Sequence, residues 1–113
     1  MSIDSKRLLL AFEQRLRQIN RETLNPLIEE MTLDQLDPLI RMVAQARGQY
    51  LQQLVALANS TDGGMPQDQQ IKELQRTRIR FDELSSAAKA LETAIDKGYL
   101  DVKLGSAAAD AEH

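Results

Sequence analysis

The chain has 113 residues, of which 42% are hydrophobic and 27% charged, and its formal net charge is −3. This length allows one domain with a modest core, and the acidic balance argues against general binding to nucleic acid, which requires an excess of Lys and Arg. The absence of cysteine excludes disulfides, thiolate metal sites and a cysteine nucleophile, and it suits the reducing cytoplasm, where we expect the protein to be located.

The amino acids available for a core indicate an all-α fold. Aromatic residues make up only 4% of the chain and tryptophan is absent, so the core must consist of Leu, Ile, Val, Ala and Met. Leu, Met and Ala have high helix propensity, whereas β-branched residues are not enriched. We predict a single helical domain over residues 1–104, with a disordered tail at 105–113.

The first helix is predicted over residues 4–22. Its apolar positions are spaced by three and four residues, which is typical of one helix face: Leu9, Phe12, Leu16 and Ile19. The charged residues include more cations than anions, and a basic amphipathic helix can lie on an anionic membrane or dock on a partner. We favour a helix of a bundle with a solvated charged face. The apolar run that ends before Glu13 is too short for a secretory signal, and no run approaches the ~20 residues of a membrane span.

A short phrase then occurs twice. It consists of Leu, Asn or Asp, Pro and two aliphatic residues: Leu24-Asn25-Pro26-Leu27-Ile28 and Leu36-Asp37-Pro38-Leu39-Ile40. Asn and Asp favour the N-cap and Pro favours the first helical position. We predict a short helix at 26–30 and a second long helix at 33–59, with Thr32 and Gln35 forming a capping box. The sequence leaves open whether the two prolines break the helices or only kink them.

Two long helices are predicted to pack against each other. A loop rich in turn-forming residues separates helix 33–59 from a third helix at 67–97, for which Gly98 is the expected C-cap. The apolar face of the third helix is interrupted by Arg78. We expect an antiparallel hairpin of these helices, joined by the first helix in a three-helix bundle, and the wide apolar faces predict a dimer.

The segment after Gly98 is the one part of the chain that does not look helical. Residues 99–104 alternate between apolar and polar side chains, as in a strand. We find no second strand for it to pair with in the sequence. We therefore expect this segment either to dock on the bundle or to pair with a strand of a partner.

The sequence offers little catalytic chemistry. The single histidine is the last residue, His113, which argues against His-based catalysis and metal binding. Glu-x-x-His pairs of a di-iron bundle are absent, and the glycine pair at 63–64 is not followed by a phosphate-loop pattern. We predict that the protein is not an enzyme and has no cofactor or metal.

The function predicted is that of a non-catalytic helical module for protein–protein interaction, such as an adaptor, chaperone or assembly factor, acting as a homo-oligomer. In size, acidity and lack of catalytic residues the chain is similar to small helical secretion and flagellar chaperones, a likeness that implies only the fold class. The predicted partner or self-association face comprises Leu39, Val43, Tyr50, Leu54, Leu57, Ile71, Leu74 and Phe81. The alternative is a nucleic-acid-associated regulator with phosphate contacts from a basic ridge: Lys72, Arg76 and Arg80.

Overall fold

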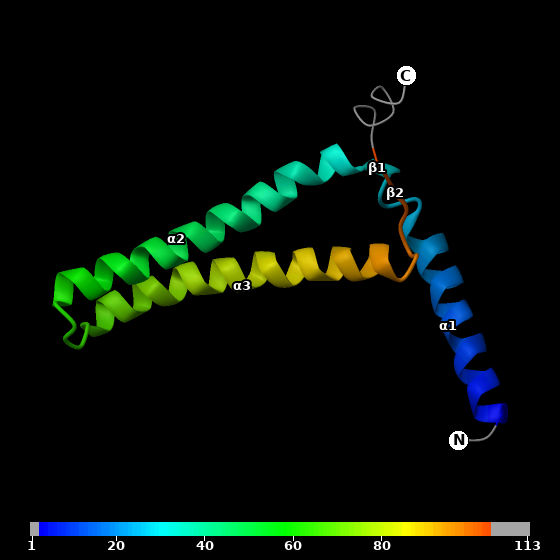
Figure 1. Cartoon of the computed structure of the whole chain (residues 1–113), viewed down its shortest axis with the longest axis horizontal. Helices are drawn as coiled ribbons and strands as arrows, with labels where there is room; N and C mark the ends of the chain where they lie inside the picture. Colours follow the sequence, from blue (N-terminus) through cyan, green and yellow to red (C-terminus); the bar gives the residue numbers. More distant parts are fainter. Residues whose placement is uncertain (1–2, 105–113) are drawn as a thin grey trace. The chain divides into compact units, whose positions relative to one another are not determined.

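A computed structural model describes residues 3–104 and shows a chain that is mostly helical (Figure 1). The helices are α1 (Ile3–Leu24), α2 (Asp37–Thr61) and α3 (Asp68–Asp96), with a 3₁₀ turn η1 (Leu33–Leu36) and two short strands, β1 (Met31–Thr32) and β2 (Val102–Lys103). This confirms the all-α prediction. The disordered tail predicted at 105–113 lies outside the described residues.

Two compact units make up the chain, and each is described by itself. Unit 1 combines the residues up to Leu36 with those from Leu91 onward, and unit 2 comprises Asp37–Ala90. Unit 1 therefore contains α1, both strands and the last turn of α3. Unit 2 contains α2 and most of α3.

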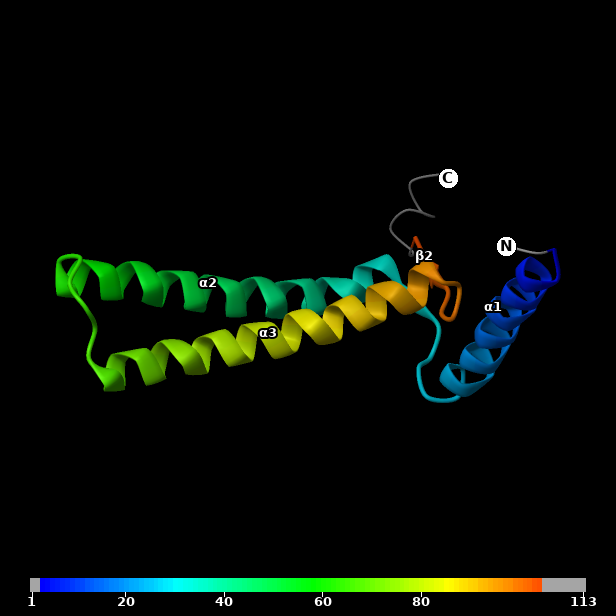
Figure 2. The ribbon, with the colours of Figure 1, turned by 90° about the horizontal axis from the view of Figure 1, so that it is seen from below.

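The helices of unit 2 lie side by side in two perpendicular views and are joined by residues 62–67 (Figures 1 and 2). Helix α2 begins at the second copy of the repeated phrase, where Pro38 falls in the first turn and therefore removes no intrahelical hydrogen bond. The helix ends where Asp62 adopts a positive φ of 51° and the Gly63 amide donates to the Ala58 carbonyl at 3.2 Å. This reversal satisfies carbonyls that the helix end would leave unpaired.

The buried side of α2 is narrower than its apolar composition suggests. Ala46 is only 4% exposed, and half-buried side chains recur on either side of it every three or four residues: Leu39, Val43, Tyr50, Gln53 and Leu57. The sequence pattern favoured Leu54 on this stripe, but Gln53 occupies the position and Leu54 is exposed. Packing of two helices selects positions by the alternating spacing of three and four, and not by hydrophobicity alone.

The same correction applies to α3. Its half-buried positions within unit 2 follow the alternating spacing: Gln70, Leu74, Thr77, Phe81, Leu84 and Ala88. Thr77 occupies the place that the sequence pattern gave to Arg78, and its hydroxyl donates to the Leu74 carbonyl at 2.8 Å. Arg78 is exposed and pairs with Asp82 one turn further on, with Nε 4.0 Å from Oδ2. The expected interruption of the core by a charge therefore does not occur.

In unit 1, the first copy of the phrase ends a helix instead of starting one. The short helix predicted at 26–30 is absent, and a turn follows α1, with the Ile28 amide donating to the Leu24 carbonyl at 2.8 Å. Pro26 has no amide hydrogen to continue the helix, which explains why proline is common just after a helix end. The two copies of the phrase thus have opposite roles.

The segment after α3 pairs with a strand of its own chain. β2 lies parallel to β1, with Met31 opposite Val102 and Thr32 opposite Lys103. The expectation that the chain offered no strand for 99–104 is therefore wrong. A strand of two residues carries no readable periodicity, and the capping-box pattern of Thr32 and Gln35 predicts a helix start here instead. The Thr32 amide does donate to Gln35 Oε1 at 2.8 Å, which is one half of the predicted capping box.

Gly98 directs the chain from α3 into β2. It has a positive φ of 77°, its amide donates to the Ile95 carbonyl at 3.1 Å, and the Tyr99 amide donates to the Ala94 carbonyl at 2.8 Å. These two bonds form a Schellman cap, in which glycine is preferred because it adopts a positive φ without strain. The C-cap predicted at Gly98 is confirmed.

Candidate functional site

Phe81 lies at the centre of the contact between α2 and α3. Its ring stacks on the Tyr50 ring, with centroids 6.2 Å apart and planes 25° from parallel. The guanidinium carbon of Arg47 lies 5.3 Å from the centroid of the same ring, within the range of a cation–π interaction. On the next residue, Arg80 Nη1 donates to Gln49 Oε1 at 3.4 Å. These contacts fix residues 47–50 at the level of residues 80–81.

A second apolar surface lies on the solvent side of this pair. It is called the outer apolar face and comprises Ile40, Leu51, Leu54 and Val55 of α2 with Ile71 of α3. All five side chains are exposed, from 45% for Ile71 to 60% for Val55. At about 100° per residue, its α2 members lie about 60° to 160° around the helix from the half-buried stripe. One helix therefore carries two apolar stripes, and only one of them faces α3.

The two sides of the α2–α3 pair differ in polarity. On one side, a shallow hollow of about 230 Å³ is lined by Tyr50, Ile71, Leu74, Gln75 and Arg78. On the other, a hollow of about 240 Å³ is lined mostly by polar residues: Gln53, Ala56, Leu57, Ser60, Gln70 and Glu73. The first hollow adjoins the outer apolar face through Ile71. Neither hollow is lined by a group of acids and bases suited to catalysis.

The structure divides the predicted partner face into two sets. Six of its residues are half-buried along the two stripes of the helix pair: Leu39, Val43, Tyr50, Leu57, Leu74 and Phe81. Leu54 and Ile71 remain exposed and belong to the outer apolar face. The sequence pattern did not identify Leu51 and Val55 as site residues, although both side chains belong to the outer apolar face.

The basic ridge proposed as an alternative lies on the outer side of α3. Lys72, Arg76 and Arg80 are all exposed and are spaced by four residues, so they share a helix face. Arg80 also donates to Gln49 as described. Glu73 and Glu83 lie close to this face in the helical register and reduce its positive charge.

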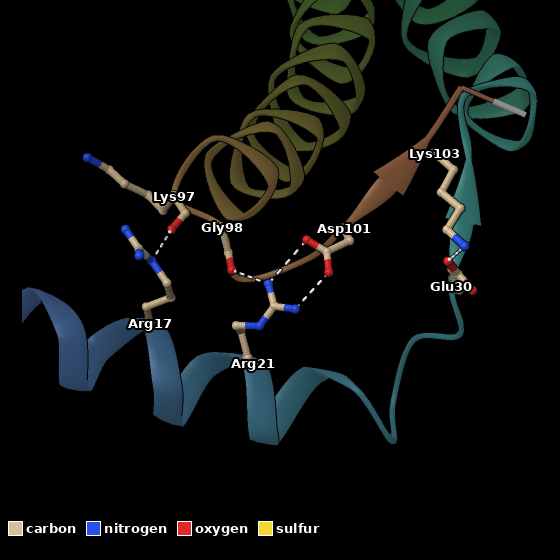
Figure 3. A network of polar contacts seen from close by, with 7 residues as sticks. All are labelled: Arg17, Arg21, Glu30, Lys97, Gly98, Asp101 and Lys103. Atoms are coloured by element: carbon tan, nitrogen blue, oxygen red, sulfur yellow. Dashed lines mark hydrogen bonds and ion pairs between the residues drawn. The ribbon is translucent and has the colours of Figure 1, made fainter.

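Unit 1 contains a polar network that the sequence did not indicate, called here the clasp (Figure 3). Arg21 of α1 donates from Nη1 to the Gly98 carbonyl at 2.7 Å and to Asp101 Oδ1 at 3.2 Å, and from Nη2 to Asp101 Oδ2 at 2.7 Å. One turn earlier, Arg17 Nε donates to the Lys97 carbonyl at 3.4 Å. Both arginines therefore bind the carbonyl end of α3, where cations are favoured by the helix dipole.

The clasp extends to the strand pair through a second ion pair. Lys103 Nζ lies 2.6 Å from Glu30 Oε1, so the second residue of β2 binds the residue that precedes β1. The hydrogen bond to Glu30, followed by its charge, raises the pKa of Lys103. In the same way Asp101 raises the pKa of Arg21, while the hydrogen bond and charge of Arg21 lower the pKa of Asp101. These shifts indicate that all three groups are charged in the folded state near neutral pH.

The clasp holds α1 by its polar side. The predicted stripe of Leu9, Phe12, Leu16 and Ile19 is exposed, with Phe12 at 58%. At about 100° per residue, Arg17 and Arg21 lie roughly 140° around the helix from the centre of that stripe. The apolar stripe of α1 therefore faces away from the part of unit 1 to which the helix is tied.

Within residues 3–104, no three His, Cys, Asp or Glu side chains lie together as a metal site would require. In the same range, no helix is long and apolar enough to cross a membrane. No protein-family model matches the chain, and no curated protein or solved structure matches it either.

Proposed function

We propose that this protein is a non-catalytic helical module for protein–protein interaction that acts as a homo-oligomer, with a dimer as its basic form. In this proposal α2 and α3 form an antiparallel hairpin, and α1 contributes the third helix of a bundle. An adaptor, chaperone or assembly factor would use such a module. The cytoplasm is the proposed location.

The observation that carries the proposal is the outer apolar face. Of the residues described, only Ala46 and Leu100 are buried, whereas eighteen large hydrophobic side chains are exposed. Single exposed apolar side chains are common on proteins, but several adjacent ones mark an interaction surface. Leu51, Leu54 and Val55 occupy adjacent turns of α2, and the exposed Ile71 of α3 lines one hollow together with Tyr50 of α2. Burial of these side chains against another protein would stabilise the complex, at ~25 cal/mol per Å² of apolar area.

Substitution of this face tests the proposal. Leu54→Glu with Val55→Glu places two carboxylates on the outer apolar face, whereas Gln45→Glu with Gln52→Glu adds the same charge to exposed positions on the polar side of α2. We expect sedimentation velocity to show a dimer for the native chain and the control, and a monomer of 12.7 kDa for the Leu54/Val55 variant. A native chain that sediments as a monomer would contradict the proposal.

Circular dichroism controls for folding of the variants. Because Leu54 and Val55 are exposed, their replacement should leave the helical signal close to that of the control. A Leu54/Val55 variant that is monomeric and has the same helical signal as the control would locate the interface on the outer apolar face. A variant that loses its helical signal is to be replaced by Leu54→Ala with Val55→Ala, for which a weakened dimer is expected.

The nucleic-acid alternative makes a different prediction for α3. If Lys72, Arg76 and Arg80 contacted phosphates, duplex DNA would bind with a steep salt dependence, and Arg76→Ala with Arg80→Ala would abolish binding. The interaction module predicts no such binding. It also predicts that the same double substitution leaves the dimer intact, because Arg76 lies off the outer apolar face.

A further inference from the structure

We infer that a second copy of this chain covers the outer apolar face, with the two α2 helices packed antiparallel about a twofold axis at the level of residue 49. This inference rests on the proposed homo-oligomer and specifies its geometry. Two features lead to it: the order of large and small residues on α2, and the distribution of charge along α3.

The first feature is the spacing of the second stripe of α2. Its positions follow one another by four, three, four, three and four residues, an order that reads the same in both directions: Ile40, Ala44, Arg47, Leu51, Leu54 and Ala58. Such alternation is the pattern of a helix-packing seam. A second copy running in the opposite direction therefore meets the same spacing, with its midpoint at residue 49.

The sizes of the side chains favour the antiparallel arrangement. About that midpoint, Ile40 faces Ala58 of the second copy and Leu54 faces Ala44 of the second copy, so these large side chains meet small ones. The remaining pair is Leu51 with Arg47 of the second copy, whose guanidinium lies over the Phe81 ring of its own chain. A parallel arrangement would place each residue opposite itself, with Ala44 against Ala44. Helix interfaces pack densely when large and small residues alternate across them.

The second feature is the charge of α3. Four cations and two carboxylates precede Phe81 in this helix, whereas one cation and four carboxylates follow it. Phe81 contacts Arg47 and Tyr50, so the charge changes sign at the level of the midpoint of the α2 stripe. Antiparallel copies place the basic half of one α3 along the acidic half of the other. Parallel copies would place like charges together, which is unfavourable.

Cysteine crosslinking tests this geometry, because the native chain contains no cysteine. Ile40→Cys is expected to crosslink with Ala58→Cys through a short bis-maleimide when the two proteins are mixed, but not with itself. In the antiparallel pair, position 40 lies ~27 Å along the axis from its own counterpart, at ~1.5 Å per residue, but at the level of position 58.

The matched control is a mixture of Gln45→Cys and Gln52→Cys. These two positions lie at the same level as each other in the antiparallel pair, but they are on the polar side of α2 and should not crosslink. A dimer in which Ile40→Cys crosslinks to itself would be parallel and would overturn the inference, as would a dimer that crosslinks only through Gln45 and Gln52. Both outcomes leave the proposed homo-oligomer standing, whereas a monomeric native chain removes both proposals.

Discussion

Arg21 binds Asp101 through both terminal nitrogens, with Nη1 3.2 Å from Oδ1 and Nη2 2.7 Å from Oδ2. The same Nη1 also donates to the Gly98 carbonyl at 2.7 Å. One side chain of α1 thus binds the cap of α3 and the segment that leads into β2. A bidentate pair of this kind fixes orientation as well as distance, and the clasp therefore determines how α1 meets the rest of unit 1.

Replacement of Arg21 by Ala should open the clasp. We expect amide hydrogens of residues 97–103 and of Met31 and Thr32 to exchange several-fold faster, because this segment then loses the three hydrogen bonds that Arg21 donates to Gly98 and Asp101. Hydrogen exchange measured by mass spectrometry provides the test. Arg15→Ala, on the same helix, is the control and should leave these rates unchanged. Equal exchange in both variants would show that the clasp does not hold the strand pair.

Acid should open the clasp through Asp101. Its pKa lies below the ordinary value of 3.8, so the ionised form stabilises unit 1 above that pH and the contribution disappears as the pH falls through the lowered value. An NMR titration of the Asp101 carboxyl carbon should give a pKa below 3.8 in the native chain and a higher pKa in Arg21→Ala, because the hydrogen bond and the charge of Arg21 are then lost. Identical titrations in the two proteins would contradict the pairing in solution.

Alkali should weaken the ion pair between Lys103 and Glu30. The pKa of Lys103 lies above the ordinary 10.5, so its contribution is complete below that pH and is lost as the pH rises through the raised value. Glu30→Gln should lower the pKa of Lys103, because the hydrogen bond and the charge of Glu30 are then lost, and the chemical shift of the ε-carbon of Lys103 reports the change. Lys89→Arg leaves this pair intact and serves as the control. A Lys103 titration that is unchanged by Glu30→Gln would exclude the pair.

Gly98→Ala should destabilise unit 1. The φ of 77° at this position costs an L residue about 1–2 kcal/mol, and the new Cβ would lie 3.4 Å from Arg17 Nε. Because the Arg17 side chain is flexible, we attribute most of the loss to the backbone. Urea denaturation followed by circular dichroism measures it. A free energy of unfolding equal to that of the native chain would mean that α3 does not end in this cap in solution.

Gly48→Ala should stabilise the native chain. Alanine stabilises a helix interior by about 0.5–1 kcal/mol relative to glycine, and a Cβ at position 48 would meet no atom within 4 Å. Urea denaturation followed by circular dichroism measures the gain. A free energy of unfolding below that of the native chain would show that this position is not open in solution.

Local signals in the sequence predicted the elements that depend on neighbouring residues. Gly98 ends α3 and Gln35 accepts the hydrogen bond from the Thr32 amide, because both effects act within a few residues. The Asn25-Pro26 phrase predicts a helix start, and this prediction is wrong. The same residues can also follow a helix that has just ended, as they do after α1. The strand β1 that comes next pairs with residues about seventy positions away, which no local pattern indicates.

The candidate site shows the same division between local and distant effects. The apolar pattern of the sequence predicts Leu54 on the packed stripe of α2 and Arg78 as an interruption of the stripe of α3, whereas the geometry of two helices selects Gln53 and Thr77. The surplus apolar residues of α2 then form the outer apolar face. Arg17 and Arg21 share a helix face, and this was the one signal for the clasp, but the sequence alone does not show that Asp101 and the end of α3 lie within reach.

The molar mass of the native chain in solution tests the central claim most directly. Size-exclusion chromatography with light scattering, over a dilution series reaching tens of micromolar, should give twice the 12.7 kDa of one chain, because the outer apolar face is then covered by a second copy. A mass of 12.7 kDa throughout the series would contradict the account.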